Sequence, residues 1–196
     1  EWGSQVTRGL GKPGVSGSLS KGDSPLTIGL RADIDALPIE ETTGLPWAST
    51  APGKMHACGH DGHTTILLAA AKYIASPACQ FNGTVHLIFQ PAEEAIGGAD
   101  LMIKDGLFEQ FPCERIFGLH NMPGLPVGKL GFYAGNFMAS ADTVKITITG
   151  YGGHGAHPER TVDPIVAGAA LVMALQSIVA RNVPPGGTAG LSVGSF

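Results

Sequence analysis

Three short apolar runs, each followed closely by polar residues, constrain the fold more than any other feature. The runs cover residues 26–30, 84–89 and 115–119 and are typical of buried strands. The polar residues that follow them are Asp33, Glu93, Glu94 and His120. Open α/β sheets bind their ligands at the carboxyl ends of the strands. We therefore expect these polar side chains to meet at one edge of a sheet.

The segments between the runs have the signals of helices. Thr64 or Thr65 is a candidate cap for a helix over 66–75, which Ser76-Pro77 would end. A second helix is expected over 98–104, with Gly106 as a left-handed terminus. Strands that alternate with helices predict an α/β sheet.

The pattern changes near residue 139. Residues 142–149 alternate strictly between apolar and polar, which predicts a strand with one face in water. A long helix is expected from Asp163-Pro164 to about residue 180, followed by a short strand over 191–193. We therefore expect two domains, 1–138 and 139–196, of which the second is a smaller α+β module.

Residues 56–63 gather three histidines, a cysteine and an aspartate, all of which are metal-ligand types. Cys58 and His60 are two apart, so an extended backbone points both side chains the same way. A thiolate with an imidazole suits Zn²⁺ and similar metals better than Mg²⁺. His56 and His63 fit either as ligands or as supporting turn residues. Asp61 is a candidate for orienting an imidazole from behind.

Two further segments add candidates for the chemistry. Successive side chains diverge, so one of Glu93 and Glu94 can bind metal while the other takes a proton from water. Two solvated acids at a helix start are the alternative. His120 follows a strand and is a candidate ligand. His154, in the glycine-rich loop 152–158, is either an oxyanion donor or part of a polar loop.

Composition narrows the class of protein. Of 196 residues, 43% are hydrophobic and 14% charged, as in a globular protein. The net charge of -4, without a basic stripe, argues against nucleic acid as a partner. Three unevenly spaced cysteines favour a reducing compartment, and we expect a cytoplasmic protein. No apolar run is long and clean enough to predict a membrane span. Both ends of the chain lie inside apparent structure, which suggests a fragment.

Taken in order, five motifs resemble the amidohydrolase branch of the M20 metallopeptidases, which includes hippurate hydrolases, N-acyl-amino-acid deacylases and auxin-conjugate hydrolases. The motifs lie at 31–38, 55–63, 91–94, 118–120 and 152–158. The resemblance implies an α/β, zinc-peptidase-like catalytic domain with an inserted α+β lid or dimerisation domain. It also implies that both are incomplete. Full members have a helical segment before residue 1, and they return to the catalytic domain after the lid to supply one last histidine ligand.

The resemblance also implies roles for single residues. The implied metal ligands are Cys58, His60, Glu94 and His120, with Cys58 bridging two divalent ions among Mn²⁺, Zn²⁺, Ni²⁺ and Co²⁺. Glu93 matches the general base and Asp33 an acid behind the ligands. His154 matches a histidine that approaches the substrate carbonyl, often from the partner subunit of a homodimer.

The function expected on these grounds is hydrolysis of the amide bond in N-acyl amino acids, hippurate-like or N-acetylated. Arg181 and Asn182, at the end of the long helix, are candidates for binding the substrate carboxylate, and Arg160 and Arg31 compete with them. A dipeptidase of the same superfamily is one alternative. A non-catalytic fragment that dimerises or binds metal is another.

Overall fold

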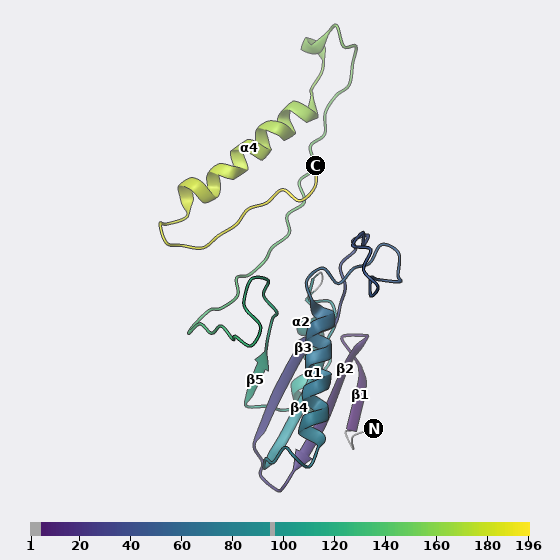
Figure 1. Ribbon diagram of the computed structural model, residues 1–196. Helices are drawn as coiled ribbons and strands as arrows, with labels where there is room; N and C mark the ends of the chain where they lie inside the picture. The colour runs from purple at the N-terminus through teal and green to yellow at the C-terminus, as the bar shows by residue number, and fades with distance from the viewer. Residues whose placement is uncertain (1–4, 95–96) are drawn as a thin grey trace. The chain divides into compact units, whose positions relative to one another are not determined.

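The computed structural model describes residues 5–94 and 97–196. It divides into two compact units, Glu1–Leu130 and Gly131–Phe196, each of which is described by itself (Figure 1). The expected boundary after residue 138 falls inside the second unit. As a boundary between functional domains it stays a prediction.

The first unit is built on one mixed five-stranded sheet in the order β1-β2-β4-β3-β5. The strands are β1 (Gln5–Leu10), β2 (Gly14–Lys21), β3 (Thr27–Asp33), β4 (Gly83–Gln90) and β5 (Arg115–Gly118). β3 pairs in parallel with both β4 and β5, whereas β2 pairs antiparallel with β1 and β4. The α/β class expected from the alternation of strands and helices is confirmed.

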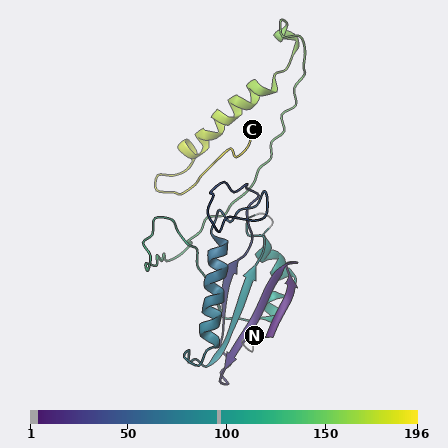
Figure 2. The same cartoon turned by 45° about the vertical axis from the view of Figure 1, so that its right-hand side comes forward.

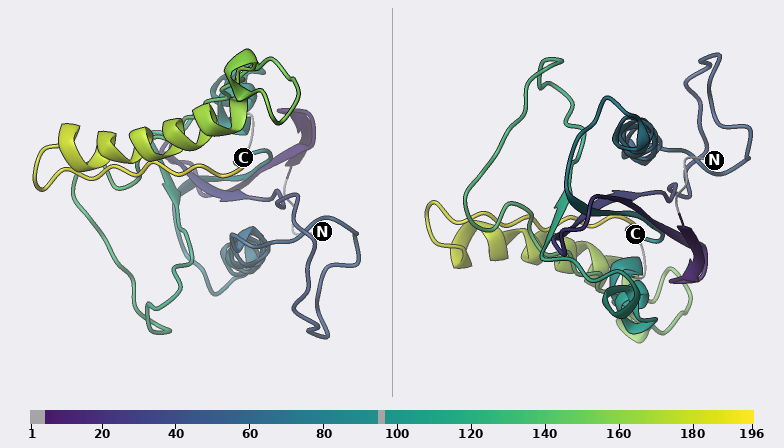
Figure 3. Two further views of the ribbon diagram at one scale, coloured as in Figure 1. Left: turned by 90° about the horizontal axis from the view of Figure 1, so that it is seen from above. Right: turned by 90° about the horizontal axis from the view of Figure 1, so that it is seen from below.

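Helices cover both faces of this sheet. Seen end on, α1 (His60–Ala75, blue) lies on one side, while α2 (Gly98–Lys104) and α3 (Leu107–Gln110), both teal, lie on the other (Figure 3). Successive side chains of β4 explain the two layers. Leu87 packs in the core beneath α1, and Ile88 packs with Met102 in the core beneath α2 and α3.

The connections place the carboxyl ends of three strands together. α1 links β3 to its neighbour β4 across one face, and α2 with α3 links β4 to β5 across the other. The first crossover runs from β3 to β4 by way of α1 (Figure 2), and the second runs back from β4, past β3, to β5, so the chain reverses its direction along the sheet. A crevice at such a reversal of strand order is the usual ligand site of an open α/β sheet.

Two features of this unit differ from the sequence prediction. α1 begins at His60 rather than near residue 66, because Gly59 takes a left-handed conformation (φ 91°) and starts the helix without a side-chain cap. The β1-β2 hairpin was not anticipated. Its many serines and glycines lack the strong apolar alternation that marks a strand.

The second unit contains one long helix, α4 (Pro164–Asn182), as expected. The carboxylate of Asp163 accepts from the backbone N–H groups of Ile165 and Val166, a cap that stabilises a helix by about 1 kcal/mol. A short 3₁₀ turn, η1 (Pro158–Arg160), precedes it, and Tyr151 forms a single antiparallel bridge with Val162.

The strands expected over 142–149 and 191–193 are not formed, and this part of the prediction is wrong for the described chain. A strand exists only when its backbone groups pair with another strand. Neither segment has such a partner among the described residues of this unit.

The apolar length of α4 also corrects an expectation. By length and composition alone this helix could cross a membrane. An 18-residue stretch of it has a mean hydropathy of 1.6, and only 6% of that stretch is buried. The expectation that no apolar segment would be long enough is therefore wrong. Helices packed inside soluble proteins pass the same test, so this property does not place α4 in a membrane.

Candidate metal centre

His60 opens α1 and points one free ring nitrogen into the edge of the sheet. Its Nδ1 donates to the backbone oxygen of Asp35 at 3.0 Å, which leaves the lone pair on Nε2. Nε2 is buried and has no hydrogen-bond partner among the described residues. A buried imidazole lone pair without a donor is what a metal ligand requires, and the hydrogen bond at Nδ1 fixes the necessary tautomer.

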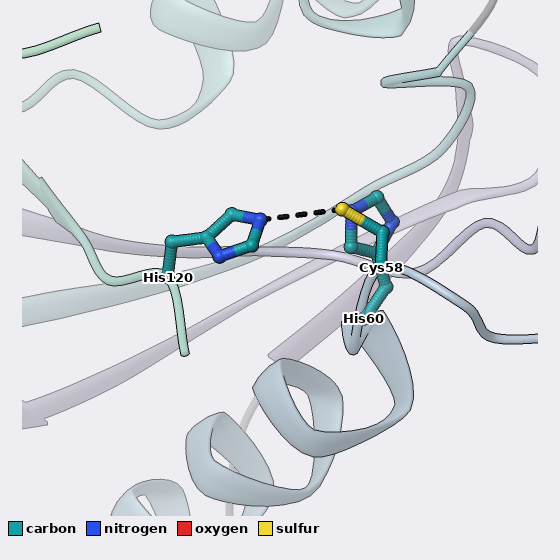
Figure 4. A group of neighbouring side chains, drawn as sticks. All are labelled: Cys58, His60 and His120. Carbon is teal, nitrogen blue, oxygen red and sulfur yellow. Dashed lines mark hydrogen bonds between the residues drawn. The ribbon is translucent and has the colours of Figure 1, made fainter. Parts of the chain in front are cut away.

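Cys58 and His120 approach this nitrogen from different segments (Figure 4). An isolated bridge between Leu37 and Met55 closes the intervening loop and returns the chain, with Cys58, to the end of β3. His120 follows the end of β5 by two residues. The Sγ atom of Cys58 lies 3.4 Å from Nε2 of His120.

Glu93 and Glu94 follow the end of β4. The residue before them, Ala92, has a φ of 53°, a left-handed conformation that is uncommon outside glycine and clusters at functional sites. The backbone N–H of Glu94 donates to Asp35 at 3.0 Å, and Oε1 of Glu94 lies 3.7 Å from Nε2 of His60. The turn is thus tied to the same aspartate that orients His60.

Asp33 ends β3 and is almost fully buried behind the site. Arg31 donates to one carboxylate oxygen at 2.8 Å, and His63 lies 2.6 Å from the other. Burial alone would raise the pKa of Asp33, but the bond to His63 and the charge of Arg31 outweigh it and lower this pKa below its ordinary value.

The surroundings of Cys58 disfavour the charged form of its thiol. Burial, a hydrogen bond with Glu94 and the negative charges of Glu94, Glu93 and Asp33 raise the pKa of the thiol to about 11. The thiol is therefore protonated at neutral pH, and a bound cation would have to displace its proton.

The donor set fits a divalent metal. In each of three groups the candidate ligand atoms lie within 4.8 Å of one another: Cys58 with His60 and His120; His60 with Glu93 and Glu94; and Asp33 with His60 and His63. Ligands about 2.0–2.3 Å from one tetrahedral ion lie about 3.3–3.8 Å apart. The separations of 3.4 and 3.7 Å at this site are within that range.

The other predicted site residues lie outside this cluster or in the second unit. Asp61 is exposed in the first turn of α1, and its carboxylate has no hydrogen bond to the cluster among the described residues. In the second unit His154 accepts from the N–H of Ala156 at 3.1 Å, and Arg181 and Asn182 are exposed in the last turn of α4. The roles suggested for these four residues stay predictions.

Two residues with clear roles in this geometry were not singled out from the sequence. Asp35 orients His60 and anchors the Glu94 turn, and Asn121 contacts His63. The spacing of Asp33 and Asp35 at a strand end was a usable signal for the first, since residues two apart share a face. Asn121 had no signal beyond its position next to His120.

A candidate metal site at the strand ends of a mixed α/β sheet is compatible with a metal-dependent hydrolase, and comparison with known families points to a family of peptidases. The model of peptidase family M20/M25/M40 matches residues 29–193. The chain belongs to this family.

Individual relatives fall in the branch expected from the motifs. The chain is 54% identical to a hippurate hydrolase of Campylobacter jejuni and 46% identical to an N-acetyl-L-cysteine deacetylase of Bacillus subtilis, in both cases over its whole length. It covers 51% and 47% of these two proteins, and so spans about half the length of the curated relatives.

One solved structure that resembles this chain is of a metal-binding protein. The YxeP protein of Bacillus subtilis, described as a dinuclear metal-binding peptidase of the M20 family, matches with a TM-score of 0.60 and 41% identity. The match covers 65% of this chain and 35% of that one.

Proposed function

We propose that this chain forms part of a metal-dependent amidohydrolase that cleaves N-acyl amino acids into a carboxylate and a free amino acid. The observation that carries the proposal is the buried, unpartnered Nε2 of His60, which faces Cys58 and Glu94 beside an adjacent glutamate. Hippurate hydrolase and N-acetyl-L-cysteine deacetylase, whose names describe this type of reaction, are relatives across the whole chain.

The proposal gives the two glutamates different tasks. Glu94 binds metal, since its carboxylate lies beside Nε2 of His60. Glu93 takes the proton of the attacking water and later returns it to the leaving amine, so that one water adds across the amide bond. His154 donates to the oxyanion, and Arg181 and Asn182 bind the substrate carboxylate. Asp61 assists from behind the ligands.

Cys58, His60, Glu94 and His120 would hold the metal, and we propose two divalent ions at this site. Bound metal supplies Lewis-acid chemistry at the substrate carbonyl and to water. The thiolate and the imidazoles favour Zn²⁺, Ni²⁺ or Co²⁺ over Mg²⁺, and the carboxylate of Glu94 also suits Mn²⁺. The dinuclear description of YxeP supports the number of ions.

A single substitution tests the assignment of the base. Glu93→Gln in the full-length protein keeps the shape of the side chain but cannot accept a proton. We expect kcat for hippurate or an N-acetyl amino acid to fall by about 10²–10⁴-fold while bound metal is unchanged. The measurement is steady-state hydrolysis together with metal analysis of the same sample.

The matched control is Glu109→Gln, an identical change at an exposed position on α3. It should leave both readouts at the wild-type level. Turnover retained in Glu93→Gln would show that another group takes the proton.

A dipeptidase is the second candidate function, and the description of YxeP as a peptidase favours it. Dipeptides carry a free amino group where N-acyl amino acids carry an acyl chain without charge. A panel of both substrate types separates the two. Higher kcat/KM for N-acyl amino acids is the expected result, and a consistent preference for dipeptides would replace it.

We further propose that the protein is cytoplasmic and forms a homodimer through the second unit. The reducing compartment is supported by Cys58, Cys79 and Cys113, all of which are free thiols. The dimer is supported by the exposed apolar side chains of α4.

A further inference from the structure

His120 lies on a segment that has little to hold it in place. β5 is only four residues long and ends at Gly118, and the residues after it form no helix or strand up to Tyr151. His120 itself is exposed, yet its Nε2 is held 3.4 Å from the thiol of Cys58. A ligand on an irregular segment needs a separate anchor if it is to keep this position.

The contacts of His63 supply that anchor. His63 lies one turn after His60 on α1 and is buried. Its Nδ1 is 2.6 Å from Oδ1 of Asp33, and because a carboxylate only accepts, Nδ1 is the donor. Its Nε2 then accepts from the backbone N–H of Asn121 at 2.9 Å, and the side-chain Oδ1 of Asn121, itself an acceptor, contacts the same nitrogen at 2.9 Å without donating to it.

This pattern separates His63 from its neighbour on the helix. Nε2 of His60 is free and faces the other ligands, whereas both nitrogens of His63 are already engaged. Asp33, His60 and His63 are close enough together to hold an ion, but His63 has no lone pair left to offer. The geometry therefore excludes His63 as a ligand in this arrangement.

The anchor reaches back into the sheet. The carboxylate of Asp33 accepts hydrogen bonds from Arg31 as well as His63. The Nε of Arg31 in turn donates to Gln90 on β4 at 2.8 Å. On the other side, His120 Nδ1 lies 2.6 Å from the backbone oxygen of Asn121, and the rings of His63 and His120 stand edge to face with centroids 4.5 Å apart. A continuous chain of contacts thus runs from β3 and β4 to His120.

We infer that His63 is a positioning residue, which ties the His120-Asn121 segment to the buried carboxylate of Asp33 and so holds His120 against Cys58. The inference rests on the proposed function only in requiring a metal centre at this site. The two ring nitrogens have separate tasks, one toward the sheet and one toward the segment that carries the ligand.

Titration of the metal-free, full-length protein with Co²⁺ tests this without any substrate. Co²⁺ bound by a thiolate gives a charge-transfer absorption band, which reports the Cys58 half of the site. His63→Asn keeps a donor near Asp33 but cannot reach Asn121. We expect its dissociation constant for Co²⁺ to rise by about 10–100-fold and the band to weaken.

Two further variants sharpen the result. His63→Gln places an acceptor near the position of Nε2, and we expect it to recover most of the lost affinity. Asn121→Ala removes only the side-chain contact at an exposed position, and a smaller loss of affinity is expected. If His63→Asn does not fold, Asn121→Ala alone decides the outcome.

The control is His86→Gln. His86 is also buried with both ring nitrogens bonded, to Ser18 and to Pro112, but it lies against Phe111 rather than at the metal site. It should lose stability and keep its cobalt affinity. Wild-type affinity in both His63→Asn and Asn121→Ala would overturn the inference. Absence of cobalt binding in the wild type would overturn it together with the proposed function, whereas cobalt binding without amide hydrolysis would contradict the function alone.

Discussion

At the scale of the residue, hydrogen bonds to the ring nitrogens separate the buried histidines of the first unit. His60 keeps one ring nitrogen free to bind a metal, whereas both ring nitrogens of His63 form hydrogen bonds that connect separate segments. His86 also uses both, inside β4, with Nε2 donating to the backbone oxygen of Pro112 at 3.0 Å. The sequence marks His60 as a candidate ligand but leaves the role of His63 open, because the partners that decide it, Asp33 and Asn121, come from distant parts of the chain.

His86 gives a prediction about pH. Burial lowers its pKa below the ordinary 6.5, although the bond to Pro112 opposes this. The unfolded chain therefore takes up the proton at a higher pH than the folded chain does. The stability contributed by neutral His86 is present above about pH 6.5 and is lost as the pH falls from there through the lowered folded pKa.

Urea unfolding at about pH 7.5 and about pH 5 measures this loss. His86→Gln has no titrating ring, so its free energy of unfolding should change less between the two pH values than that of the wild type. An equal change in both proteins would show that His86 does not contribute.

At the scale of the element, the start of α1 decides where the site forms. Gly59 has a φ of 91°, and a Cβ added to it would lie 2.3 Å from the side-chain amide of Asn121. The residue thus begins the helix that carries His60 and also leaves room for the segment that carries His120.

Gly59→Ala should therefore lower both the stability of the protein and its affinity for metal. A left-handed alanine costs about 1–2 kcal/mol of stability, and the clash with Asn121 should in addition weaken metal binding. Gly97→Ala is the matched control: Gly97 starts α2 with a φ of 68°, and nothing lies within 4 Å of its added Cβ. Chemical unfolding and metal titration of both variants give the comparison. Equal losses of metal affinity would remove the special role of Gly59.

Most strands of the first unit's sheet could be predicted from the sequence, whereas the strand expected in the second unit could not. The runs at 26–30, 84–89 and 115–119 were recognisable as strands because each is a short apolar run. β4 is largely buried, as such a run predicts, whereas β5 at the edge of the sheet is exposed, so the expectation of a buried strand is wrong there. The meeting of the three runs at one edge followed from the alternation with helices. The segment 142–149 failed as a prediction because alternation shows which face is wet but not whether a partner strand is present.

At the scale of the whole molecule, the second unit exposes an apolar helix. Val166 and Met173 of α4 are 66% and 74% exposed. Exposed apolar surface of this kind usually marks an interface. The proposed homodimer would cover it, and the apolar length of the helix makes a membrane the competing explanation.

Met173→Asp tests this in the full-length protein. A charge in the centre of the apolar face should shift the protein from dimer to monomer in sedimentation velocity, with bound metal unchanged. Tyr73→Asp, at an exposed position on α1, is the control and should leave the dimer intact. Persistence of the dimer in Met173→Asp would place the interface elsewhere, and recovery of the wild type only with detergent or lipid would favour the membrane.

We propose above all that Cys58, His60, Glu94 and His120 form a metal centre at the edge of the sheet. The most direct measurement is divalent metal per chain, by elemental mass spectrometry, in the full-length wild type, Cys58→Ala and His86→Gln. We predict about two equivalents in the wild type and in His86→Gln, and a clear loss in Cys58→Ala, which lacks a proposed ligand. Wild-type protein without metal after reconstitution, or Cys58→Ala with a full complement, would contradict the account.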